Sequence, residues 1–126
     1  MGYGQVNVGA TSSNITLGVS VAQGNGTQIG DVIDTNNTNE KTINLTGCGI
    51  NEGRDSTEYS KGIAEGSNDN STWNTILQTD SDNFKIFGGS GQNKTGTTSY
   101  RYIRARTSAK GGGSRVMACV TAALVR

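Results

Sequence analysis

The chain of 126 residues contains no histidine, and this absence removes whole classes of enzyme chemistry. Histidine is the commonest general base and transition-metal ligand, and without it no Ser-His or Cys-His catalytic pair can form. A Gly-rich tract at 88–91 precedes Lys94, but the GxxxxGK[ST] spacing of a phosphate-binding loop is missing. We therefore predict that the protein is not an enzyme and that it has no catalytic residues, no cofactor and no metal site.

Cysteine is scarce as well, since the chain has only Cys48 and Cys119, without the spacing of a zinc site. Each stands in a strand-like run, so we expect buried free thiols, while a disulfide requires their strands to be neighbours. The alternative to our prediction of no metal site is a calcium site built from loop carboxylates, although aspartate is also an ordinary turn residue. The carboxylates in loop-like segments are Asp31, Asp34, Asp69, Asp80 and Asp82.

The chain has no proline, and only 32% of its residues are apolar. Its turns must therefore come from Gly, Asn and Asp, which tolerate positive φ. The start of the chain has neither the basic nor the apolar segment of a signal peptide. No apolar run approaches the ~20 residues that cross a bilayer. We expect a soluble protein that is made in the cytoplasm and has no membrane partner.

Short alternating patterns are what the sequence does contain. Ile15, Leu17, Val19 and Val21 alternate with polar or small residues, as the apolar positions of a half-buried antiparallel strand do. Other strand-like runs lie at 6–8, 29–33, 42–46, 58–66, 73–77, 84–87, 100–106 and 116–125, with Gly- and Asn-rich turns between them. Roughly eight strands at this spacing predict a single all-β domain over residues 1–126. We expect an antiparallel β-sandwich, jelly-roll-like, with a barrel as the alternative.

The last run, 116–125, is apolar on both faces. A strand of this kind is expected to be covered on both sides, either between two sheets or at a subunit interface. Charge is also unevenly distributed, because residues 1–84 hold all ten acids and three bases, whereas 85–126 hold eight bases and no acid. The two parts can pair with each other, or the basic part can meet an acidic neighbouring subunit; nucleic acid is the least favoured partner.

Tyrosine and arginine alternate in 100–106, and this run has two interpretations. Its side chains can stack on and pair with single-stranded nucleic acid, or it is a strand with one face in the core and arginine stems over apolar edges. We favour the strand. Trp73, the single tryptophan, is interpreted as a core anchor, with a sugar-stacking platform as the alternative. The candidate partner or subunit interface comprises Tyr100, Arg101, Tyr102, Arg104, Arg106 and Arg115.

Three segments, 65–76, 100–106 and 116–124, carry a resemblance to known proteins. Together they resemble small β-sandwich proteins of tailed-bacteriophage virions, which carry a "GSNDGxxW" hairpin, a "YRYIR" strand and a closing apolar strand. The hairpin and the Tyr-Arg-Tyr strand also resemble, more weakly, discoidin-type and carbohydrate-binding sandwiches. The cysteine bracket and signal peptide of the discoidin type are missing, so the phage resemblance is preferred.

The phage resemblance implies a structural virion protein, foremost a capsid decoration or cement protein that binds and stabilises neighbouring capsid subunits. Its implied place is the capsid exterior, after synthesis in the host cytoplasm. Its implied partners are the major capsid protein or other virion proteins. We expect a homo-oligomer, preferably a trimer and alternatively a dimer. The alternative function is a carbohydrate- or surface-binding module of a phage tail or fibre.

Overall fold

A computed structural model describes residues 16–50, 59–79, 91–110 and 115–124, with the backbone alone at 48–50, 59, 91, 115 and 124. The described residues form nine strands and no helix. In chain order the strands are β1 (Thr16–Gly24), β2 (Gly26–Ile29), β3 (Ile33–Asp34), β4 (Lys41–Ile50), β5 (Tyr59–Ser67), β6 (Asn74–Gln78), β7 (Gly91–Thr98), β8 (Tyr102–Lys110) and β9 (Arg115–Leu124). Within these ranges, no helix suited to spanning a membrane occurs.

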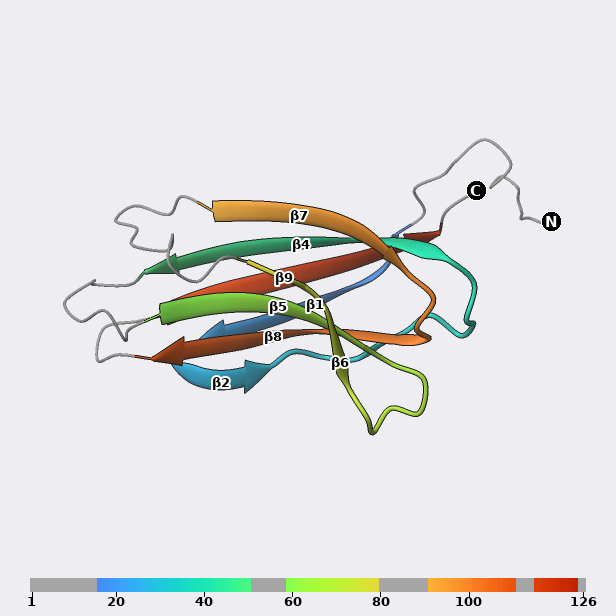
Figure 1. Cartoon of the computed structure of the whole chain (residues 1–126), viewed down its shortest axis with the longest axis horizontal. Helices are drawn as coiled ribbons and strands as arrows, with labels where there is room; N and C mark the ends of the chain where they lie inside the picture. Colours follow the sequence, from blue (N-terminus) through green and yellow to red (C-terminus); the bar gives the residue numbers. More distant parts are fainter. Residues whose placement is uncertain (1–15, 51–58, 80–90, 111–114, 125–126) are drawn as a thin grey trace.

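Strand pairing is nested along the chain. β1 pairs with β9, β2 with β8, β4 with β7 and β5 with β6, and every pair is antiparallel. Such nesting results when one long antiparallel hairpin is rolled up so that its legs alternate between two sheets, as in a jelly roll. The sheets have the orders β1-β9-β4-β7 and β2-β8-β5-β6, with β3 beside β8, and Figure 1 shows them as two layers. The predicted all-β, jelly-roll-like sandwich is confirmed.

Half of the buried residues in the core between the sheets are alanine. Ala64, Ala105 and Ala118 are fully buried in it. A Cβ added to Gly62 would lie 3.2 Å from the Cβ of Ala118, so the two sheets approach closely there. The larger buried core residues are Ile33, Ile43, Leu45, Ile103 and Val120.

The turns form where Gly and Asn supply positive φ. Gly24 and Gly26 have φ of 138° and 73°, and between them the chain leaves one sheet and enters the other. Asn36 and Asn70 adopt the left-handed conformation, with φ of 63° and 58°. These positions confirm the predicted turns at 24–26, 36–37 and 68–70, which the chain builds without proline.

Between β2 and β3, where the edge strand is interrupted, a side chain from the opposite sheet takes its place as a hydrogen-bond acceptor for β8. Gly30 N donates a hydrogen bond to the Ala105 carbonyl at 2.9 Å, and Ala105 N donates to Ser20 Oγ at 2.8 Å. A Cβ on Gly30 would lie 2.6 Å from the Val21 carbonyl oxygen, so only glycine fits this crossing. Ser20 therefore satisfies a buried amide of β8 that the interrupted edge strand leaves unpaired.

The predicted strands agree with the structure at most positions. The segments 15–21, 42–46, 58–66, 73–77, 100–106 and 116–125 correspond to β1, β4, β5, β6, β8 and β9. The run 29–33 is divided between the end of β2 and the start of β3, and the predicted strands at 6–8 and 84–87 lie outside the described residues. β7 was not predicted, because Gly91–Thr98 has no apolar side chain to alternate.

Candidate functional site

The side chains of β8, the predicted interface strand, alternate between core and surface. Ile103 and Ala105 are fully buried inside the sandwich, whereas Arg104 and Arg106 stay partly exposed on the outer side. This confirms the interpretation of the Tyr/Arg run as a strand with one core face. The outer side of the β2-β8-β5-β6 sheet is here called the arginine face, and its central residues are Tyr102, Arg104, Arg106, Glu65 and Trp73.

One carboxylate joins the two central arginines of this face. Glu65 lies opposite Arg104 in the β5–β8 register and is only 6% exposed. Its Oε1 accepts a hydrogen bond from Arg104 Nε at 3.0 Å, and its Oε2 accepts one from Arg106 Nε at 2.9 Å. Because residues two apart on a strand point to the same face, a single acid between the arginines is shared by both.

Trp73 lies over this cluster and not in the core. The guanidinium carbon of Arg104 is 3.9 Å from the centroid of the indole ring, a close cation–π contact. Trp73 is half-buried and precedes β6 directly, so its ring covers the outside of the sheet. The prediction that Trp73 anchors the core is therefore wrong, while its role as a sugar-stacking platform stays a prediction.

The loop that leads into Trp73 is held by Asp69. Its Oδ1 accepts hydrogen bonds from Thr72 N at 2.7 Å, from Ser71 N at 2.8 Å and from Ser67 Oγ at 2.9 Å. These bonds, that from Thr72 foremost, lower the pKa of Asp69 to about 2, because they stabilise the charged carboxylate. An ionised Asp69 thus fixes the approach of the chain to Trp73.

Arg101 forms a separate ion pair at the end of the same sheet. Its Nε donates to Asp34 Oδ1 at 2.8 Å and its Nη2 to Asp34 Oδ2 at 3.0 Å, so the carboxylate is bound at both oxygens. The bond from Arg101, and then that from the backbone N of Asn36, lowers the pKa of Asp34. The pair is well exposed, with 38% and 45% of the two side chains accessible. Arg101 also lies 4.9 Å from the ring centroid of Tyr102.

These ion pairs join acids from the acidic part of the sequence to bases from its basic part. Arg101, Arg104 and Arg106 come from the basic part of the chain, whereas Asp34 and Glu65 come from its acidic part. Long-range strand pairing brings the two parts together on one sheet. The structure therefore agrees with the interpretation that acids and bases of the same chain pair, and contact with an acidic neighbouring subunit stays a prediction.

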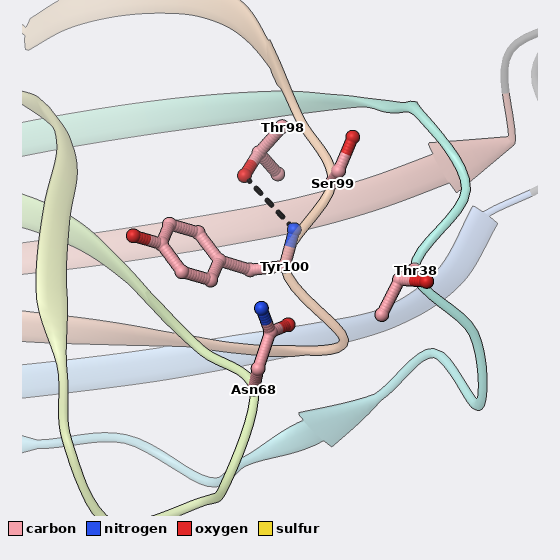
Figure 2. Close-up of a pocket in the computed structure, with 5 residues that line it drawn as sticks. All are labelled: Thr38, Asn68, Thr98, Ser99 and Tyr100. Carbon is pink, nitrogen blue, oxygen red and sulfur yellow. Dashed lines mark hydrogen bonds between the residues drawn. The ribbon is translucent and has the colours of Figure 1, made fainter.

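Of the other two residues predicted for the interface, Tyr100 does not join the arginine face, and Arg115 begins β9 in the other sheet. Tyr100 packs at the end of the sandwich beside Gly66 and Ile76, and the side chain of Arg115 lies outside the described residues. Tyr100 lines a pocket of about 190 Å³. Figure 2 shows it with the other lining residues, Thr38, Asn68, Thr98 and Ser99. Small-molecule sites usually measure ~300–1,000 Å³, so this pocket is small for one.

Next to this pocket, a fully buried lysine ties two loops together. Lys41 Nζ donates to the carbonyl oxygens of Asn39 at 2.6 Å, Tyr100 at 3.0 Å and Asn37 at 3.3 Å. Burial lowers the pKa of Lys41, because it disfavours the charged ammonium. Three carbonyls match the three donors of the ammonium group, so we assign Lys41 a structural role.

The outer side of the other sheet, here called the neutral face, carries no charged side chain among its described positions. Register places Val19, Thr121, Asn44 and Thr95 in one row and Val21, Cys119, Thr46 and Asn93 in the next. Val19 is 52% exposed, Val21 46% and Met117 43%. The small residues Ser20 and Ala22 occupy the buried positions of β1 instead. Val19 and Val21 therefore face outward, whereas Leu17, before them in β1, packs against the core.

The β4–β7 half of the neutral face is a ladder of uncharged hydrogen bonds. Asn44 Nδ2 donates to Thr95 Oγ1 at 3.0 Å, and Thr46 Oγ1 donates to Asn93 Oδ1 at 2.9 Å. Thr46 Oγ1 also lies 3.3 Å from Asn44 Oδ1, along the same strand. The face is thus apolar over β1 and β9 and amide- and hydroxyl-rich over β4 and β7.

The cysteines and loop carboxylates build no site in the described part of the chain. Cys119 is a free thiol, half-buried on the neutral face. In the β4–β9 register, Cys48 pairs with Met117 and Cys119 pairs with Thr46, so the two cysteines are diagonal neighbours and not direct register partners. No group of three His, Cys, Asp or Glu side chains is placed to hold a metal ion among the described residues. Asp80 and Asp82 lie outside those residues.

Comparisons of the chain with known proteins found no relative. No family model matches the chain, and no curated protein matches it.

Proposed function

We propose that the protein is a structural virion component, a capsid decoration protein that binds and stabilises neighbouring capsid subunits. The observation that carries the proposal is the neutral face, where Val19, Val21 and Met117 are each more than two-fifths exposed. Grouped apolar exposure on a surface whose described side chains carry no charge is typical of a protein–protein contact.

Two further features support this proposal. Apart from Arg115 and Thr121, β9 is apolar on both sides; the second sheet covers its inner side, and its outer side is the part of the neutral face that a neighbouring subunit would cover. Jelly rolls also serve as viral capsid and lectin domains, which makes the fold compatible with the role, although a fold alone does not define a function. We expect the chain to bind as a homo-oligomer, preferably a trimer.

The test is binding to particles. Mass spectrometry of gradient-purified virus particles should find the chain, and particles that lack it should disassemble at a lower temperature and regain stability when purified chain is added back. Val21→Lys places a charge in the neutral face and should abolish rebinding. Val32→Lys is the matched control, because Val32 is 41% exposed but lies between β2 and β3, at the other sheet. A chain that is monomeric by light scattering and absent from particles would contradict the proposal.

One observation favours the second candidate, a carbohydrate- or surface-binding module of a phage tail or fibre. Trp73 stacks on Arg104 outside the core and is partly exposed, so its ring can contact a ligand. This second function uses the arginine face, whereas the first uses the neutral face, so each can be tested while the other is left intact.

A further inference from the structure

The arginine face contains two guanidinium groups that are incompletely paired. Arg101 shows complete pairing, since its Nε and Nη2 both donate to the two oxygens of Asp34. Arg104 and Arg106 share one carboxylate, because the Nε of each donates a hydrogen bond to a different oxygen of Glu65. Among the described residues, no hydrogen bond is made by the Nη nitrogens of Arg104 or Arg106.

This incomplete pairing occurs where water is partly excluded. The side chains of Arg104 and Arg106 are 17% and 27% exposed, against 38% for Arg101. One carboxylate balances two guanidinium charges, and no second carboxylate of the described chain pairs with either arginine. A positive charge in a half-buried site attracts an anion more strongly than one in open water does. The site therefore has the donors and the charge for one external anion.

The surroundings of the two arginines indicate the kind of anion. Two-pronged guanidinium donors match the two oxygens of a carboxylate. Apolar surface borders the pair on both sides, because the indole of Trp73 lies on Arg104 and Ile29, 55% exposed, is opposite Arg106 in the β2–β8 register. A ligand with an apolar ring face and a carboxylate at its edge fits both features, and a uronic acid has this form.

We propose that Arg104 and Arg106, together with Trp73, form a binding site for the carboxylate of an acidic saccharide. The guanidinium Nη groups bind the carboxylate, and Trp73 and Ile29 contact the C–H face of the sugar ring. This inference rests on the second candidate function and is independent of the capsid contact at the neutral face. Val21→Lys should therefore leave saccharide binding unchanged.

Trp73 makes the test direct, because the single tryptophan of the chain lies in the proposed site and its fluorescence reports on it alone. The full chain is titrated with an oligogalacturonate and, as a neutral match, with its methyl ester. The acid should change the emission in a saturable manner, and the ester should not. Arg106→Gln should weaken binding about tenfold, the loss of one charged hydrogen-bond partner.

Lys110→Gln is the matched control. It removes the same charge from the same face of β8, but about 13 Å further along the strand, and should leave affinity unchanged. If circular dichroism shows that Arg106→Gln does not fold, Arg106→Lys replaces it, since lysine keeps the charge and loses the two-pronged donor. Equal binding of acid and ester, or equal loss in Arg106→Gln and Lys110→Gln, would overturn the proposal. Saturable binding of polyglutamate or inorganic phosphate but not of the saccharide would overturn it as well.

Discussion

The arginine face and the neutral face cover opposite sides of one sandwich and differ in how their side chains depend on one another. On the arginine face, Glu65, Arg104 and Trp73 are linked in series, so the position of each depends on the next. On the neutral face, Thr46 contacts both Asn93 and Asn44 through uncharged side-chain groups at the surface, and Val19 and Val21 point into solvent. The contacts of the first face are charged and largely buried, whereas those of the second are uncharged and exposed, so each of them contributes little.

The difference indicates that the ionic network of the arginine face stabilises the fold, whereas the exposed side chains of the neutral face contribute little to stability. A half-buried ionic network rigidifies its members, because the loss of one leaves charged partners without compensation. An exposed ladder of uncharged pairs costs little to change, so its composition is free to match a partner. Mutations should therefore affect stability mainly on the arginine face and association mainly on the neutral face.

The largest effect is expected from Glu65→Gln. This change leaves Arg104 and Arg106 without their carboxylate in a site where Glu65 is 6% exposed. Removing one partner of a buried ion pair costs ~3–5 kcal/mol, and partial exposure of the arginines reduces this to about 2–3 kcal/mol. Urea unfolding followed by circular dichroism measures the loss. Asp34→Asn breaks the exposed pair with Arg101 and should change the unfolding midpoint far less; an equal loss would contradict the distinction.

Much of the fold could be predicted, because local patterns fixed the strands. Alternation located β1 and β4, and Gly24, Gly26 and Asn70 marked turns that need positive φ. β7 could not be found, since a strand of Gly, Gln, Asn, Lys and Thr has no apolar period and is held by pairing with β4. The side of β1 that faces the core was also not deducible. Ser20 and Ala22 face inward, where Ser20 accepts a hydrogen bond from the buried amide of Ala105.

The candidate site was found only in part. Alternation in 100–106 indicated that Arg104 and Arg106 share a face, and this needed no knowledge of the fold. Their partner Glu65 is about forty residues away, and only the β5–β8 register brings it opposite Arg104. Trp73 was misplaced because a lone tryptophan in a small β-domain usually lies in the core, and nothing local indicates that its ring stacks on an arginine.

The second effect is a pH dependence that arises from Asp69, on the arginine side. Folding lowers the pKa of Asp69 from 3.8 to about 2, so its charged form stabilises the fold fully above about pH 4. This stabilisation is lost as the pH falls through about 2, when the folded carboxyl takes up its proton. Asp69→Asn should therefore melt below wild type at neutral pH, with a difference that disappears near pH 2. Melting temperatures across this range, followed by Trp73 fluorescence, measure it, and parallel curves for the two proteins would contradict the assignment.

The smallest effect is expected from Thr46→Val on the neutral face. The change removes the hydroxyl that bonds Asn93 at 2.9 Å, but both side chains are exposed and water can replace the lost partner. Valine also favours a strand at least as strongly as threonine, so the unfolding free energy should change by about 0.5 kcal/mol or less. Urea unfolding against wild type measures this. A loss comparable to that of Glu65→Gln would show that the exposed ladder stabilises the fold as strongly as the ionic network, and it would remove the basis for treating the neutral face as a surface free to fit a partner.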